Sequence, residues 1–181
     1  MPARRIVVAA AAALGLLAGT AAANGRYGLG QVATPAEIAG WDIDVLPDGT
    51  GLPPGSGSVQ QGAALYAARC AACHGAHGEG KPMPRLAGGQ GTIFSKKPVK
   101  TVGSYWPYAT TLFDYVRRAM PLEAPQSLSA DQVYAVSAYV LFLNHLVGDD
   151  AVMDAASLPK VAMPNRSHFV SAYRPDPAPA K

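Results

Sequence analysis

The sequence predicts an all-α domain with an extended N-terminal arm and an irregular C-terminal tail. Apolar residues recur at helical spacing in three stretches, at about 60–71, at about 108–119 and from 130 onwards. The domain shows no convincing sheet, and glycine and proline are frequent in the segments that flank it. We therefore expect four parts: a leader at residues 1–23, the arm at 24–58, the helical domain at 59–146, and a tail at 147–181 whose last residues, RPDPAPAK, are disordered.

Residues 1–23 have the features of a secretory signal peptide. Arg4 and Arg5 form a basic start, an apolar run from Ile6 to Leu17 follows, and Ala21-Ala22-Ala23 supplies small residues for cleavage. The apolar run is short for a membrane span, so cleavage after Ala23 is favoured over a retained anchor. No later segment is long and apolar enough to cross a membrane. We expect export to the periplasm without a stable membrane anchor.

The charge of the exported chain is nearly balanced. Without Arg4 and Arg5, 13 of the 15 basic residues remain against 12 acidic ones. This balance is not that of a basic nucleic-acid-binding protein, so no nucleic-acid partner is expected. The distribution is uneven, because residues 81–118 contain one acidic residue, Asp114, and seven basic ones, which predicts a positive face. The seven are Lys81, Arg85, Lys96, Lys97, Lys100, Arg117 and Arg118.

The arm is expected to be extended, with no helical period. It is rich in glycine and proline and ends in GTGLPPGSGS. Within it, Trp41 to Val45 alternate apolar with acidic residues, which predicts a half-buried strand. A single strand is not stable by itself, so we expect it to lie either on its own domain or along another protein.

The domain is expected to contain three helices. The first covers about Gln60–Ala71, and a glycine-rich loop follows at Gly75–Gly91. The second covers about Tyr108–Ala119 and is stopped by Pro121, whose ring also disfavours helical geometry at the preceding residue. The third is capped by Ser129 and continues with valines and leucines at helical spacing.

Cys70, Cys73 and His74 form a Cys-x-x-Cys-His motif at the end of the first predicted helix. A structural zinc site would need four ligands, and the other histidines are scattered. A dithiol–disulfide site at this spacing usually begins a helix within a βαβ unit, which is not the pattern here. Covalent attachment of a c-type haem uses all three residues, two as thioethers and the imidazole as iron ligand. The motif favours haem and by itself leaves the other two chemistries open.

Met120 is the strongest candidate for a second axial ligand. It lies directly before Pro121, where the chain leaves the second helix and a thioether could turn inward. A Met/His pair fills both axial positions of a haem iron and raises its potential, which favours electron transfer. Core packing is the alternative role for this methionine. Met83, Met153 and Met163 are weaker candidates.

Residues 59–146 resemble the class I c-type cytochromes. The family's glycine and aromatic residue one turn apart are matched by Gly62 and Tyr66, and Tyr139 matches the aromatic residue that meets them from the last helix. The family's Pro-x-Leu-x-Gly is matched by Pro84 to Gly88. The resemblance implies the class I cytochrome c fold, one covalent haem c, and a Pro84 carbonyl that accepts the ring N–H of His74.

Leu86, Tyr105 and Trp106 are further residues expected at the haem. Leu86 belongs to the proline–leucine–glycine motif that the family shares. Tyr105 and Trp106 begin the run Tyr105-Trp106-Pro107-Tyr108, and flat rings pack well on a porphyrin. A docking surface for another protein is the alternative role for this aromatic run.

A narrower resemblance covers nearly the whole exported chain. The stretches YGLGQVATPAEIAGWDIDVLPDGTGLPPGSGSV, LAGGQGTIF, KTVGSYWPYATTLFDYVRRAMP and SLSADQVYAVSAYVLFLN are similar to the cytochrome subunit of the Sox sulfur-oxidation system. In that family the subunit pairs with a molybdenum-containing dehydrogenase of sulfane sulfur or sulfite and accepts electrons from it. We expect the same role here, with another cytochrome as the acceptor. Family members often carry a second haem domain, whereas this sequence has one haem motif.

Two other functions are compatible with a haem motif. One is a free-standing shuttle cytochrome without a permanent partner. The other is a sulfur-acting redox enzyme in its own right, which would need a free cysteine or an open iron position. Because both cysteines would be used as thioethers and Met120 would fill the iron, we expect no catalytic residue in this chain, which is then not an enzyme on its own.

Overall fold

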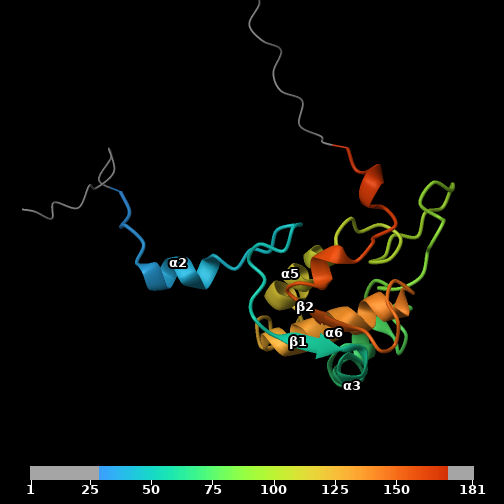
Figure 1. Cartoon of the computed structure of the whole chain (residues 1–181), viewed down its shortest axis with the longest axis horizontal. Coiled ribbons are helices and arrows are strands. Elements are labelled where there is room, and N and C mark those ends of the chain that lie inside the picture. Colours follow the sequence, from blue (N-terminus) through green and yellow to red (C-terminus); the bar gives the residue numbers. More distant parts are fainter. Residues whose placement is uncertain (1–28, 171–181) are drawn as a thin grey trace, which may run out of the picture. The chain divides into compact units, whose positions relative to one another are not determined.

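The computed structural model describes residues 29–170, which belong to two units divided between Ile43 and Asp44. Most of the elements belong to the second unit, in which the short β1–β2 sheet lies beside α6 and α3 (Figure 1). The elements in chain order are α2 Pro35–Trp41, β1 Ser56–Ser58, α3 Val59–Arg69, α4 Ala71–His74, α5 Ala109–Ala119, α6 Ala130–Leu143, β2 Val152–Asp154, and the 3₁₀ turns η1 Leu158–Lys160 and η2 Arg166–His168. The predicted all-α class is confirmed.

The longer helices begin and end at recognisable signals. Ser58 caps α3 and Ser129 caps α6, each in a capping box with the glutamine three residues later. Helix α5 ends at Ala119, and Met120 has the extended backbone angles φ −125° and ψ 147° that a residue before proline prefers. The second predicted helix therefore ends where the sequence indicated.

Helices α3 and α6 cross closely at Gly62. A methyl group at this position would lie 1.9 Å from the carbonyl oxygen of Ala135 and 2.8 Å from the Cβ of Tyr139. One turn later, the ring of Tyr66 packs at 5.2 Å on the ring of Tyr139. The packing of Gly62 and Tyr66 against the last helix, implied by the family resemblance, is thus present.

The core lies between α5 and α6 and extends into the segment after α6. Phe113 and Tyr134 are fully buried, with ring centroids 4.5 Å apart. Leu158 of η1 is also fully buried, and Met153 of β2 and Met163 are nearly so. The segment that the sequence presents as an irregular tail thus supplies core residues as far as residue 163. Its last eleven residues, including the end expected to be disordered, lie outside the described residues.

The arm differs from its predicted conformation. Residues 35–41 form α2, capped by Thr34 in a capping box with Glu37, and residues 42–46 form no strand. The strand prediction for residues 41–45 was wrong: Val45 is buried and Ile43 is half-buried, but Trp41 is 85% exposed and belongs to α2, and the residues that follow pair with no strand. The Thr34-Pro35-x-Glu37 start signal outweighs the glycines that suggested an extended chain.

The described residues also contain a two-stranded sheet that the sequence did not indicate. Ser56–Ser58 pairs antiparallel with Val152–Asp154, and Gly57 lies opposite Met153. Three-residue strands are too short to show an alternating pattern. The expected leader, residues 1–23, lies outside the described residues.

Candidate haem-binding site

The two cysteines and His74 lie on a tight turn at the end of α3. The predicted first helix ends earlier than expected, at Arg69, because Cys70 leaves helical geometry with φ −124°. The short helix α4 follows, in which the amide groups of Cys73 and His74 donate to the Cys70 carbonyl at 3.1 and 2.9 Å. Gly75 ends it with φ 83°. Cys70, Cys73 and His74 thereby come to the wall of one cavity.

The His74 imidazole is oriented by the loop that contains Pro84. Its Nδ1 lies 2.9 Å from the Pro84 carbonyl oxygen, the bond that the resemblance implied. With Nδ1–H as donor, Nε2 keeps its lone pair and can serve as a metal ligand. The loop is held close to the motif because Met83 N–H donates to the Cys73 carbonyl and Leu86 N–H to the Gly78 carbonyl, at 2.9 and 2.8 Å.

Asn144 fixes the other end of this loop. It is 1% exposed, and its Nδ2 donates to the carbonyls of Leu86 and Val140 at 3.0 and 2.9 Å. Its Oδ1 accepts from Gly88 N–H at 3.2 Å. A single side chain at the C-terminal end of α6 therefore ties down the segment that orients His74.

Met120 lines the same cavity as the cysteine–histidine turn. Its amide still donates to the Val116 carbonyl at 3.1 Å, so its backbone position is fixed by the last turn of α5. The side chain is half-buried. A soft thioether and a ring nitrogen, the donor pair predicted for a haem iron, are thus brought to one cavity.

The cavity has a volume of about 420 Å³ and is mostly apolar. Leu86 and Trp106, both predicted at the site, line it, and the Trp106 ring meets the ring of Tyr115 edge-on at 5.9 Å. An apolar cavity with two thiols, an oriented imidazole and a thioether on its walls fits a covalently attached haem. Sequence reasoning missed much of the apolar lining, although the four-residue spacing within α5 and α6 could have indicated it: Leu112, Val116, Val136 and Val140, together with Val102 and Leu128.

Tyr105 is not among the residues that line the cavity. Its ring lies 5.4 Å from that of Phe169, and Nζ of Lys100 lies 4.9 Å from its centroid. Its carbonyl accepts from Nδ2 of Asn165 at 2.7 Å. Adjacent side chains in a turn point in different directions. Trp106 lines the cavity, and Tyr105 points away from it.

The electrostatics of the site do not favour the dithiol interpretation. Burial is the main cause that raises the pKa of the Cys70 thiol to about 11. Cysteines that exchange disulfides usually have a lowered pKa, because the thiolate is the reacting form. The charged residues at the cavity are mainly cationic: Arg69, Arg85 and Lys100 against Glu123.

The described residues also give no support to the zinc interpretation. Among residues 29–170, no three side chains of histidine, cysteine, aspartate or glutamate are grouped so that they could hold a metal ion. Within the same residues, no helix combines the length and the apolar character needed to cross a membrane.

Comparison with known proteins agrees with this site. Residues 59–144 match the protein-family model described as Cytochrome c. No curated protein matches the sequence. A solved structure, the sulfane dehydrogenase SoxCD from Paracoccus pantotrophus, contains a chain that is 44% identical, with a TM-score of 0.76, over 86% of this chain and 83% of that one. The chain therefore belongs to the cytochrome c family, as a class I c-type cytochrome that carries covalent haem c and is related to a chain of a Sox-type sulfane dehydrogenase.

Proposed function

We propose that this protein is the single-haem electron-transfer subunit of a periplasmic sulfur-compound dehydrogenase. The observation that carries the proposal is the convergence of Cys70, Cys73, His74 and Met120 on one apolar cavity, with His74 oriented by Pro84. A haem electron-transfer role follows from the family. The partner, the direction of electron flow and the compartment are the finer parts of the proposal.

Each residue has a defined role in this assignment. Cys70 and Cys73 would hold the porphyrin through thioether bonds, and His74 Nε2 and Met120 Sδ would ligate its iron. When bound, haem c supplies an iron centre that gains and loses one electron. The Pro84 carbonyl keeps the proton of His74 on Nδ1, and the apolar wall that includes Leu86 and Trp106 excludes water.

The proposed electron donor is a molybdenum-containing dehydrogenase subunit that oxidises sulfane sulfur or sulfite. Support comes from the relative named sulfane dehydrogenase SoxCD and from the resemblance to the Sox cytochrome subunit. Another cytochrome is the proposed acceptor. This chain would then supply no catalytic residue and would act as one subunit of an oxidoreductase complex.

The arm is the proposed attachment to the donor subunit. Helix α2 has seven residues, none of them buried, and exposes Ile38 at 53% and Trp41 at 85%. A helix this short is marginal in water unless an apolar surface covers it. The match to the SoxCD chain covers about 156 residues (86% of 181), more than the 138 from Asp44 to Lys181 (181 minus 43), so it extends into the arm.

Co-purification from the native host, with analysis of iron and molybdenum, tests the proposal. We expect both metals in one complex, and reduction of the haem by a sulfur substrate only when the partner is present. Iron alone would indicate a free-standing shuttle cytochrome instead. Turnover of a sulfur compound by the isolated chain would indicate an enzyme in its own right.

Substitutions in the arm test the attachment. The double change Ile38→Ser and Trp41→Ser should abolish co-purification of molybdenum while the haem spectrum stays unchanged. Val152→Ser removes an apolar side chain that is 51% exposed elsewhere on the surface, and it should leave the complex intact. Molybdenum retained by the arm variant would refute the attachment.

Fractionation and N-terminal sequencing test the compartment. We expect the mature protein, beginning after Ala23, in the periplasm.

A further inference from the structure

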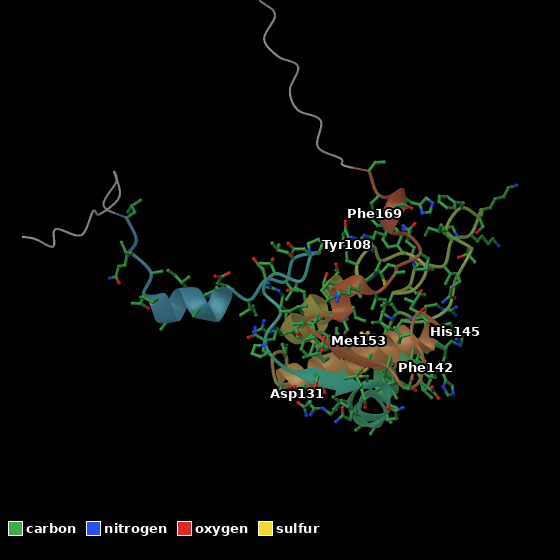
Figure 2. The ribbon with its side chains drawn as sticks, in the orientation of Figure 1. Tyr108, Asp131, Phe142, His145, Met153 and Phe169 are labelled. Atoms are coloured by element: carbon green, nitrogen blue, oxygen red, sulfur yellow. The ribbon has the colours of Figure 1, made fainter. Side chains whose placement is uncertain are left out.

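Three segments of the chain meet in a surface that combines aromatic rings with cations. Phe94 packs edge-on against the ring of His168 at 5.0 Å, and Phe169 packs on Tyr105 at 5.4 Å. Figure 2 shows Phe169 and Tyr108 on the same side of the domain. We call this surface the aromatic–cationic patch and define it as Phe94, Lys100, Tyr105, Tyr108, Arg166, His168 and Phe169.

The cations of the patch are ordered on its rings. Nζ of Lys100 lies 4.9 Å from the centroid of the Tyr105 ring, and the guanidinium carbon of Arg166 lies 5.2 Å from that of Tyr108. The patch is nevertheless open, because Phe94 is 76% exposed and Phe169 is 44% exposed. Large aromatic side chains at this exposure are typical of interaction surfaces.

The patch carries charge of one sign. Residues 81–113 and 155–170, which contain all of its members, include no aspartate or glutamate. They do include Lys96 and Lys97 in addition to the cations of the patch. A surface of one sign of charge raises the rate of encounter with a partner of the opposite sign.

The patch adjoins the haem cavity. Lys100 belongs to the patch and also lines the cavity. Tyr105 faces the patch, while the next residue, Trp106, lines the cavity. A protein bound at the patch would therefore lie next to the cavity wall, and short distances favour electron transfer. Residues 165–170 lie beyond the region that matches the cytochrome c family, so Arg166, His168 and Phe169 are additions to the common domain, whereas the other patch residues belong to it.

We propose that the aromatic–cationic patch is the docking surface for an acidic electron-acceptor protein. This inference rests on the proposed electron-transfer function and adds the acceptor's site and chemistry to it. The cations select a partner whose docking face carries carboxylates. The rings of Phe94 and Phe169 supply the apolar contact that holds it after encounter.

The test of charge uses the full-length haem protein, reduced chemically so that no donor subunit is needed. The probe is an acidic copper protein of the cupredoxin class, and its reduction is followed by stopped flow. The variant Lys100→Gln with Arg166→Gln should slow the reaction about tenfold at low ionic strength and less than about twofold at high salt. The matched control Lys160→Gln removes an exposed cation outside the patch and should change the rate less than about twofold. Equal slowing by Lys160→Gln would refute the docking site.

The test of the aromatic contact uses Phe94→Ser with Phe169→Ser, and Val152→Ser as control. We expect the dissociation constant for the cupredoxin to rise about tenfold in the first case and to stay unchanged in the second. Oxidation by tris(phenanthroline)cobalt(III), which needs no docking site, should proceed at the wild-type rate in the Phe94→Ser, Phe169→Ser protein and in the Val152→Ser protein. A parallel loss with this complex would show that the changes act on the haem and would refute docking.

The remaining outcomes separate this inference from the proposed function. Unchanged rates with the cupredoxin, or binding by the patch to anionic phospholipid vesicles or DNA instead, would refute the acceptor site while leaving the donor complex intact. Absence of molybdenum from the native complex would refute the proposed donor while leaving the cupredoxin result unaffected.

Discussion

Replacing Gly62 with alanine tests the helix crossing on which the domain is built. The added methyl group would lie 1.9 Å from the Ala135 carbonyl oxygen, whereas an ordinary contact of this kind is about 3.3 Å. The blocking atoms belong to the backbone of α6, so no side-chain rotation can relieve the overlap. Helices α3 and α6 must therefore move apart by more than about 1 Å, which also loosens the Tyr66–Tyr139 contact.

Two opposing effects determine how much Gly62→Ala changes the free energy of unfolding. Alanine is favoured over glycine inside a helix by about 1 kcal/mol. Overpacking of a close contact costs about 1–3 kcal/mol, and a backbone obstacle places Gly62→Ala at the upper end. We expect a net loss of about 2 kcal/mol in the free energy of unfolding, which lowers the melting temperature by roughly 5–10 °C.

Denaturant unfolding of the oxidised haem protein, followed by circular dichroism, measures this change. Gly40→Ala in α2 is the matched control, because its added methyl group would meet no atom within 4 Å apart from those of its chain neighbours and its own helix backbone. It should leave the unfolding midpoint of the domain unchanged. A Gly62→Ala protein as stable as wild type would refute the close crossing of α3 and α6.

Three further predictions concern the site and the core. Met120→Ala should open the iron to carbon monoxide and lower the midpoint potential, and an unchanged spectrum would contradict the assignment of this ligand. Asn144→Ala should raise the potential, because a looser Pro84 loop weakens the hydrogen bond that makes His74 a more basic ligand, and potentiometric titration measures this. Burial raises the pKa of Tyr134 to about 12, which favours its neutral form in the folded protein. The contribution of the neutral Tyr134 to the free energy of unfolding is complete below the unfolded pKa of about 10. It is lost as the pH rises through 12, and the loss is at most about 3 kcal/mol. Tyr134→Phe should flatten this alkaline loss while costing about 1 kcal/mol at neutral pH, since the hydroxyl donates to the Pro53 carbonyl at 2.8 Å.

The sequence predicted those parts of the fold and site that depend on short-range signals. The end of α5 before Pro121 and the cap of α6 at Ser129 both follow from neighbouring residues. The bond between His74 and Pro84, ten positions apart, was expected from the resemblance to the class I c-type cytochromes and not from the local pattern. Local chemistry is readable in one sequence because the partners lie within a few turns of each other.

What the sequence did not predict depends on residues far apart in the chain. Asn144 reaches Leu86 across 58 positions, and nothing in its neighbourhood in the sequence indicates that contact. The place of Tyr105 outside the cavity depends on Phe169, 64 positions later (169 minus 105). In the arm the error was of another kind, because the Thr34–Glu37 capping box was readable and the alternation at Trp41–Val45 was given more weight.

Different interactions fix the backbone near His74, on one side of the cavity, and near Met120, on the other. On the side of His74, hydrogen bonds within the loop and from Asn144 set the imidazole. On the side of Met120, Nε of Arg118 donates to Asp114 at 2.9 Å, and Arg118 also pairs with Asp44. Asp114 in turn accepts from the amide of Val45 at 3.1 Å.

These contacts tie the chain at Asp44 and Val45 to the last turn of α5, directly before Met120. A partly exposed ion pair contributes at most about 1 kcal/mol, so the link through Arg118 adds little to stability. The hydrogen bonds of Asn144 on the His74 side are buried, and removing that side chain would leave the Leu86 carbonyl without this donor. The backbone is therefore held more firmly on the His74 side of the cavity than on the Met120 side.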